Sequence, residues 1–414
     1  MAPQKPVVVV GGGTAGATVV SCLATHCPRD IVLIEPGNSS PHDDVVRFLS
    51  VLENDRIIQH TPCTLVENGP VVPYVEARVQ GGGSAVNGLL LTGEVPSMVA
   101  GLTRRARLHE VGDISGALLQ SGGELSELWW NRGRWNPGRI LGYLERGERI
   151  SIRRDNAVSL DVEDNRVVGV ITTNGYVEAE HVVMCAGALQ TPVILLRSGV
   201  RITNNNIGQG LQNHPTVTFV LGRRTDDVGV FDAAVMKKFA AGSREAMIIA
   251  YERLNGGSVD EGMLSVAIMN PTSRGQVFLD HSEPVVQFNM LSESEDMAAM
   301  RQALRHLVDT VQQDHFTAVV TQVMVGNEGS PMSVLSGMDD AQLDQWIMHN
   351  LSPVSHASSS CAAAVEPRTG ALRGIQNVTI ADASALPRVP ACTPAAPVTI
   401  EARRIAELLG EYLT

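Results

Sequence analysis

The sequence predicts an α/β protein in which a part built on a parallel sheet is joined to an α+β part built on an antiparallel sheet. The chain has 414 residues, enough for two or three domains. Hydrophobic residues make up 44% of it and aromatic residues only 4%, and such an aliphatic composition suits parallel strands buried on both faces. Beyond residue 216 the pattern changes to strands separated by turns, which is typical of an antiparallel sheet.

Charge and composition exclude several classes of protein. The net charge is −12, so a protein that binds nucleic acid or an anionic membrane surface is not expected. Only 18% of the residues are charged, which argues against a disordered chain. No apolar run approaches the roughly 18–20 residues of a transmembrane helix. The short apolar stretch near the N-terminus is better explained by the glycine motif that follows it than by a signal peptide.

The cysteines indicate a reducing environment. Six of them are spread over the chain without a C-x-x-C pair: Cys22, Cys27, Cys63, Cys185, Cys361 and Cys392. They are interpreted as reduced thiols of a cytoplasmic protein. No cluster of metal-ligating residues is apparent in the sequence, so no metal is expected.

A glycine motif lies between two predicted strands at the N-terminus. Residues 6–10 are a β-branched run, residues 17–25 have helical spacing, and residues 31–35 are predicted to form a second strand. The glycines after the first strand have the spacing G-x-G-x-x-G: Gly11, Gly13 and Gly16. This pattern in this context predicts a Rossmann-like dinucleotide site. The alternative is a glycine-rich turn without a ligand.

The chemistry of this motif favours a particular class of cofactor. The first glycine permits a tight turn, the second lets the backbone approach a pyrophosphate, and the third lets helix and strand pack closely. The helix N-terminus supplies free N–H groups to the phosphates. Glu35 follows Gly13 by 22 residues and is expected to bind ribose hydroxyls and repel a 2′-phosphate. FAD or NAD is therefore favoured over NADP.

A second glycine-rich loop spans residues 78–87 and ends in Ser84 and Asn87. Its three consecutive glycines suit a backbone that lies against a flat ring or a phosphate, and a surface loop is the alternative reading.

The next unit is predicted to be a meander that leads into the parallel sheet. Residues 150–158 and 167–173 are predicted as strands, and residues 182–187 as a buried strand. A helix is predicted over residues 188–198, with Pro192 near its start, where a missing N–H costs little.

The chain after this helix is predicted to form the second part. Residues 201–215 are interpreted as a polar connection. The predicted strands of the antiparallel sheet are residues 216–221, 246–251, 263–269, 275–279 and 285–289. An amphipathic helix is predicted over residues 294–314, with its methionines in the core.

The last 65 or so residues combine a histidine, an aspartate and a helix N-terminus. His356 lies among small polar residues, and Asp382 follows a predicted strand. The loop of residues 391–397 precedes a predicted helix over residues 398–409. Its N–H groups and the helix dipole would face an anionic group, which for a flavin is the N1–C2=O region. On its own, His356 would be interpreted as a structural residue.

These motifs together resemble the glucose–methanol–choline (GMC) family of FAD-dependent oxidoreductases. The matching blocks occur in family order from one end of the chain to the other: residues 7–20, 77–88, 135–148, 185–200, 207–215, 273–291, 355–361 and 379–390.

The resemblance implies a catalytic role for His356, which would take the proton of a substrate hydroxyl while hydride moves to flavin N5. It implies that Val158 meets the adenine, and that Asp382 and Ala383 close on the ribityl and pyrophosphate region. The full set of implied FAD-binding residues is Gly11, Gly13, Thr14, Ala15, Gly16, Glu35, Arg78, Gly82, Gly83, Ser84, Asn87, Gly88, Val158, Ala186, Gly187, Asp382, Ala383, Pro394 and Ala395.

Three features depart from the family pattern. Thr393 aligns with a second active-site position that is usually His or Asn, so a site with one histidine is expected, in which Thr393 can hydrogen-bond a substrate oxygen. The TPAA sequence that it begins resembles the mycofactocin-associated branch. Val86 replaces the histidine of covalent-flavin members, which implies non-covalent FAD. Residue 148 leads almost directly into the meander, so the substrate domain is shortened.

The resemblance implies an FAD-binding domain over residues 1–215 and 341–414, and a substrate-binding domain over residues 216–340. The implied function is an alcohol dehydrogenase or oxidase acting on a small-molecule alcohol. Its electron acceptor stays open between oxygen, a quinone and a redox cofactor. The alternatives are a redox-neutral cyanohydrin lyase and a flavin-binding member that serves a partner protein.

Overall fold

The computed structural model describes residues 4–38, 51–52, 54–95, 97–99, 101–200, 206–254 and 259–413. A parallel sheet forms the centre of the N-terminal part. Its strands follow the order β24 (Val378–Ile380), β13 (His181–Met184), β1 (Val7–Val10), β2 (Ile31–Ile34) and β9 (Ile150–Arg153). All four neighbouring pairs are parallel.

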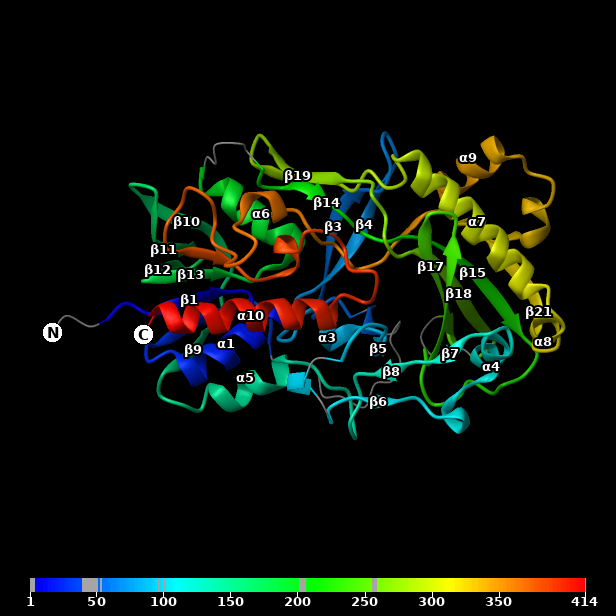
Figure 1. Ribbon diagram of the computed structural model, residues 1–414, viewed down its shortest axis with the longest axis horizontal. Coiled ribbons are helices and arrows are strands. Elements are labelled where there is room, and N and C mark those ends of the chain that lie inside the picture. Colours follow the sequence, from blue (N-terminus) through cyan, green and yellow to red (C-terminus); the bar gives the residue numbers. More distant parts are fainter. Residues whose placement is uncertain are drawn as a thin grey trace.

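This sheet lies between two layers. Figure 1 shows α1 (Thr14–His26) and α10 (Ala395–Leu413) side by side on one face, and α5 (Gly138–Leu144) packs into the same core. The other face carries α6 (Gly187–Arg197) and the meander of β10 (Ala157–Glu163), β11 (Arg166–Thr172) and β12 (Gly175–Glu178). Val7 and Val9 point into the helical layer, and Val8 and Val10 into the opposite one. The β-branched run is therefore a strand buried on both faces, as predicted.

The strand predicted over residues 150–158 is in fact two strands in different sheets. The first half is β9, which pairs with β2, and the second half begins β10 of the meander. Asp155 separates them: its buried carboxylate accepts hydrogen bonds from the backbone N–H of Asn156 and the side chain of Asn174. A turn at a polar residue that binds its neighbours' N–H groups interrupts the strand, and the apolar pattern alone did not reveal it.

The second part is built on a large antiparallel sheet. Its order is β22 (Ser330–Pro331), β21 (Val320–Val325), β15 (Pro215–Arg223), β18 (Glu261–Ile268), β17 (Arg244–Tyr251), β16 (Val235–Ala241) and β7 (Glu124–Leu125), with β23 (Ser352–Pro353) on β15. The helices that contribute to its core include α4 (Asp113–Gln120), α7 (Ser294–Val311), α8 (Asp314–Thr317) and α9 (Asp340–Asn350). The predicted α+β architecture is confirmed, whereas the helix predicted over residues 294–314 ends at Val311. The domain boundary at residue 216 stays a prediction.

Two strands predicted for this sheet belong to another one. β19 (Gly275–Asp280) and β20 (Glu283–Gln287) lie in the order β14 (Gln209–Leu211), β19, β20, β3 (Ile58–Thr64) and β4 (Val71–Ala77). The chain leaves the large sheet after β18, where the Asp296 carboxylate accepts hydrogen bonds from the backbone N–H groups of Thr272 and Ser273. This turn redirects the chain into the second sheet.

The remaining elements are short. They are α3 (Gly83–Val86), the sheet of β5 (Leu90–Leu91), β8 (Glu127–Leu128) and β6 (Arg104–Arg105), and single 3-10 turns at Ser97–Val99, Leu108–Glu110, Met332–Leu335, Ala362–Ala364 and Ala383–Ala385.

Candidate cofactor and active site

The glycine motif forms the turn between β1 and α1. Gly11 has a φ of +96°, and a Cβ atom there would lie 2.5 Å from the carbonyl oxygen of Cys185. At Gly16 a Cβ atom would lie 1.8 Å from the Gly11 carbonyl oxygen. Only glycine fits these two positions, because one requires left-handed backbone and the other allows no side chain.

The N-terminus of α1 faces the second glycine-rich loop. The helix begins at Thr14, and no side chain caps it and no acidic residue lies in its first turn. The Gly81 N–H donates to the Gly12 carbonyl at 2.8 Å, and the Thr14 hydroxyl donates to the Gly81 carbonyl at 3.1 Å. A Cβ atom at Gly83 would meet no atom within 4 Å. Uncapped helix N–H groups beside an open glycine surface are suited to an anionic group.

Glu35 directly follows β2, and its carboxylate is buried. One oxygen accepts a hydrogen bond from the Gly12 N–H at 2.6 Å, and the other accepts one from the Gly37 N–H at 2.6 Å. Burial raises the pKa of Glu35, and the two backbone hydrogen bonds act against that rise. A cavity of about 270 Å³ lies beside this turn, lined by residues that include Gly37 and Arg78. Glu35 thus shapes the glycine turn through its contacts with backbone N–H groups.

Two further residues predicted to bind the cofactor, Val158 and Asn87, lie in irregular parts of the backbone. Val158 is 36% exposed and lies at an irregularity of the pairing between β10 and β11. The loop after α3 is held at Asn87, whose backbone carbonyl accepts a hydrogen bond at 2.6 Å from Arg134, a nearly fully buried arginine. Gly88 follows Asn87 and leads into β5. Arg134 did not emerge from the sequence motifs.

Asp382 connects the ends of β24 and β13. Its buried carboxylate accepts hydrogen bonds from the Gly187 N–H at 2.8 Å, from the Thr191 hydroxyl at 2.6 Å, and from the N–H and hydroxyl of Ser384 at 2.8 and 2.6 Å. Burial raises the pKa of Asp382. These contacts bring Ala186, Gly187 and Ala383 together at the carboxyl edge of the parallel sheet, where ligands of such folds bind.

His356 is paired with a second histidine. Its Nδ1 lies 2.8 Å from Nδ1 of His214, and Nε2 of His214 lies 2.9 Å from the Pro390 carbonyl oxygen. The two rings are almost perpendicular, at 86°. His214 is fully buried, and burial lowers its pKa to about 4. His356 is half-buried, and burial together with the neighbouring His214 holds its pKa well below the ordinary value.

The segment that carries His356 is bonded to the predicted cofactor residues. The Ser359 N–H donates to the Ala383 carbonyl at 2.9 Å, and the Ser360 hydroxyl donates to the Ala188 carbonyl at 2.6 Å. The second bond also corrects the interpretation of Pro192. This proline lies inside α6 rather than near its start, and its missing N–H leaves the Ala188 carbonyl without its helical partner. Ser360 supplies that hydrogen bond.

Thr393 holds the loop before α10. Its hydroxyl donates to the Leu90 carbonyl at 3.0 Å, and its N–H donates to the Thr92 hydroxyl at 2.9 Å. Pro394 and Ala395 follow, and α10 has no acidic residue in its first turn. The hydroxyl proton of Thr393 is therefore used within the protein.

Sequence reasoning missed the group formed by Gln212, Asn213 and His214. Residues 201–205 lie outside the described residues, and the rest of the predicted polar connection forms β14 and this buried trio. Gln212 and Ser358 exchange backbone hydrogen bonds at 2.9 and 3.0 Å, and the Asn213 side chain donates to the Val354 carbonyl at 2.6 Å. Three consecutive large polar residues directly before a strand were the available signal, since buried polar groups need partners.

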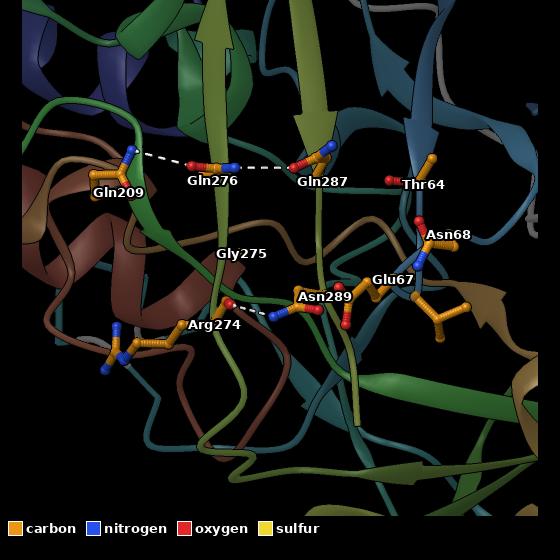
Figure 2. Close-up of a pocket in the computed structure, with 10 residues that line it drawn as sticks. Thr64, Glu67, Asn68, Gln209, Arg274, Gly275, Gln276, Gln287 and Asn289 are labelled. Carbon is orange, nitrogen blue, oxygen red and sulfur yellow. Dashed lines mark hydrogen bonds between the residues drawn. The ribbon is translucent and has the colours of Figure 1, made fainter. Parts of the chain in front are cut away.

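A separate cavity of about 440 Å³ lies on the sheet of β14, β19, β20 and β3. Figure 2 shows Gln209, Gln276 and Gln287 in a row across it, joined by amide hydrogen bonds. None of the predicted site residues lines this cavity.

The parallel sheet with its two glycine loops, joined to a histidine site beside the antiparallel sheet, defines a flavin-dependent oxidoreductase. Two family models, both described as GMC oxidoreductase, match residues 138–216 and residues 271–402, together about half of the chain. The chain belongs to the GMC oxidoreductase family, and FAD is its cofactor. The uncapped α1 N-terminus and the open surface at Gly83 fit this dinucleotide.

Known proteins resemble the chain over nearly its whole length. The 5-(hydroxymethyl)furfural oxidase of Methylovorus sp. (strain MP688) is 22% identical over 97% of this chain and 98% of its own. The structure of pyridoxine 4-oxidase from Mesorbium loti has a TM-score of 0.83, with 18% identity over 98% of this chain and 99% of that one. A structure of Aspergillus oryzae RIB40 formate oxidase has a TM-score of 0.80, with 16% identity over 99% of both chains. At these identities the structural likeness concerns the fold.

Within the described part of the chain, no helix is both long and apolar enough to cross a membrane. The same residues contain no group of three or more His, Cys, Asp or Glu side chains arranged to hold a metal ion.

Proposed function

We propose that this protein oxidises the CH–OH group of a small-molecule alcohol, with His356 as the general base. The observation that carries this proposal is the placement of His356. Its segment is hydrogen-bonded to Ala383 and Ala188 at the carboxyl edge of the parallel sheet, and its Nδ1 is used by His214. Nε2 is thus the ring nitrogen left to accept a proton. When bound, FAD supplies the hydride acceptor, at flavin N5.

The proposed cofactor contacts follow the geometry of the two glycine loops and the two helix ends. Gly11, Gly13 and Gly16, with Thr14 and Ala15, would hold the pyrophosphate at the α1 N-terminus. Glu35 and Arg78 would meet the adenosine beside the 270 Å³ cavity, with Val158 at the adenine. The residues assigned to the flavin side are Gly82, Gly83, Ser84, Asn87, Gly88, Ala186, Gly187, Asp382, Ala383, Pro394 and Ala395.

The flavin is proposed to be bound without a covalent link. Val86 has no nucleophilic atom, and its side chain is buried in a small cluster with Ile58, Val79 and Ala85. Its packing supports a role in holding α3 in place.

His356 is suited to take a proton at neutral pH. Its lowered pKa keeps the imidazole neutral near pH 7, so Nε2 carries a lone pair that can accept the alcohol proton. The reaction should therefore slow when the pH falls through this lowered pKa, and stay constant above it. While the Thr393 hydroxyl donates its hydrogen bond to the Leu90 carbonyl, it cannot donate one to a substrate oxygen.

The test is anaerobic mixing of the holoenzyme with a panel of primary and secondary alcohols. Loss of the oxidised flavin absorbance with at least one alcohol is expected, and His356→Ala should slow it at least about 100-fold. The control is His281→Ala, since the His281 side chain is 97% exposed. A persistent flavin band during aldehyde turnover, or an unimpaired His356→Ala variant, would overturn the proposal. Oxygen consumption by the reduced enzyme separates oxygen from a quinone or redox cofactor as the electron acceptor.

A further inference from the structure

We propose that His214 is a positioning residue that fixes the tautomer of His356, with the proton on Nδ1 and the lone pair on Nε2. This inference rests on the proposed function, because it concerns the nitrogen that would accept the alcohol proton. It is carried by one hydrogen-bonded chain of three groups: the Pro390 carbonyl, the His214 imidazole and the His356 imidazole.

The first step is the protonation of His214. A carbonyl oxygen only accepts hydrogen bonds, so Nε2 of His214, at 2.9 Å from the Pro390 oxygen, carries a hydrogen. His214 is fully buried. Burial outweighs the effect of the neighbouring carbonyls of Pro390 and Met269 and lowers the pKa of His214 to about 4. His214 is therefore neutral near pH 7, and a neutral imidazole has a single N–H.

The second step transfers this constraint to His356. Because the single N–H of His214 is on Nε2, its Nδ1 can only accept. The partner at 2.8 Å is Nδ1 of His356, which must then donate a hydrogen. A neutral His356 with a hydrogen on Nδ1 has its lone pair on Nε2. The reverse direction of this bond would require a doubly protonated, buried His214.

In the part of the chain that the structure describes, no carboxylate is a cause of the pKa shift of His214 or His356, so none favours such a charged state. Among the described residues, burial and His214 are the causes that lower the pKa of His356, and two backbone carbonyls alone oppose burial at His214. The pair thus differs from a histidine held by a carboxylate. Its orienting group is neutral, so it sets the tautomer without raising the basicity of His356.

The surroundings hold His214 in place and keep it away from a substrate. The backbone N–H of His214 donates a hydrogen bond to the side-chain oxygen of Asn213 at 2.8 Å, which restricts the movement of His214. The Asn213 amide donates to the Val354 carbonyl at 2.6 Å, and the His356 N–H donates to the same carbonyl at 2.8 Å. Asn213 and His214 therefore each form a hydrogen bond to the segment that carries His356, one at Val354 and one at His356 itself. His214 thus acts through His356.

The experiment compares two variants of the holoenzyme that have similar side-chain size. His214→Asn keeps an oxygen that can accept from Nδ1 of His356, whereas His214→Leu removes the acceptor. The limiting rate of flavin reduction by an alcohol should fall at least about tenfold in His214→Leu, the equivalent of one hydrogen bond, and clearly less in His214→Asn. A leucine variant that binds FAD and reduces it as fast as the wild type would overturn the inference.

A second measurement reads the tautomer directly. In holoenzyme labelled with ¹⁵N-histidine, and with His356 assigned by comparison with His356→Ala, the wild type should show the hydrogen on Nδ1 of His356. His214→Leu should shift the signal toward the Nε2–H form, which a merely structural role would not do. Nε2–H in the wild type would contradict the inference, even if the leucine variant fails to fold. If flavin reduction is slow in His356→Ala but as fast as the wild type in His214→Leu, this inference alone is rejected. If flavin reduction is fast in His356→Ala, the proposed function is rejected.

Discussion

The cofactor turn and the histidine corner are built in opposite ways. The cofactor turn is made mainly by backbone within a few consecutive residues, from Gly11 to Gly16, to which the Glu35 carboxylate adds a hydrogen bond from the Gly12 N–H. Its shape depends on the lack of side chains at Gly11 and Gly16. The histidine corner is made by side chains from three distant segments, residues 212–214, 354–358 and 389–393, joined by hydrogen bonds. A local motif in the sequence can identify the first kind of site. The second kind exists only after the chain has folded.

The largest loss of bound FAD is expected at the cofactor turn, from Gly16→Ala. The added methyl group would lie 1.8 Å from the Gly11 carbonyl oxygen, so the turn between β1 and α1 must open. FAD content per purified chain should fall at least about tenfold, a loss of only about 1.4 kcal/mol in binding, and the melting temperature should fall with it.

The control for this variant is Gly142→Ala in α5, where the added methyl group meets no atom within 4 Å. Because Gly142 is an exposed position inside α5, alanine should leave FAD content unchanged and raise stability by up to about 1 kcal/mol. A Gly16→Ala protein with full FAD content would show that the turn tolerates a side chain.

The largest loss of folding stability is expected in the histidine corner, from Gln212→Leu. The buried Gln212 side chain accepts from the Val389 N–H at 3.0 Å and donates to the Pro271 carbonyl at 2.9 Å. Leucine leaves both backbone groups without this partner, at a cost of about 1–3 kcal/mol each. The free energy of unfolding, measured with denaturant, should fall by about 4 kcal/mol.

Gln209→Leu is the matched control, three residues earlier. Gln209 is exposed, and its amide reaches Gln276 only at 3.4 Å, so a change below about 0.5 kcal/mol is expected. Equal losses in the two variants would mean that the buried hydrogen bonds of Gln212 add nothing to stability.

The same contrast explains what the sequence could and could not predict. β1 and the ends of β13 and β24 follow from apolar runs that end at or near glycine or aspartate, β2 follows from the apolar run before Glu35, and α1 follows from helical spacing. His214 could not be predicted as a partner of His356, because 142 residues separate them and only the fold brings their rings together. The prediction of a single strand over residues 150–158 is wrong for a related reason: Asp155 turns the chain through hydrogen bonds that include Asn174, 19 residues away.

A pH titration of stability tests a buried histidine of the cofactor half, His181. It lies 2.9 Å from the Thr379 hydroxyl, and burial lowers its pKa to about 4. The folded-state pKa is below the ordinary value of 6.5, so the unfolded chain binds this proton more tightly. The contribution of neutral His181 to the free energy of unfolding is fully present above about pH 6.5 and is lost as the pH falls toward 4.

The expected loss from His181 is on the order of 3 kcal/mol, since each pKa unit corresponds to about 1.4 kcal/mol. His181→Gln should reduce the acid-dependent loss by that amount, and leave the part contributed by His214. His281→Gln, at an exposed histidine, should follow the wild-type curve. If His181→Gln also follows it, His181 does not stay neutral in the folded protein.

The smallest losses of stability and of flavin reduction rate are expected at Thr393. They test whether the threonine hydroxyl takes part in the chemistry of the histidine corner. Thr393→Val removes the hydroxyl that donates to the Leu90 carbonyl, which should cost about 1 kcal/mol of stability, and Thr393→Ser should restore it. Because that proton is used within the protein, flavin reduction by an alcohol should fall less than about tenfold in Thr393→Val, far less than in His356→Ala. A valine variant as slow as His356→Ala, rescued by serine, would mean that the hydroxyl turns toward the substrate and that the chemistry depends on the threonine as much as on the histidine pair.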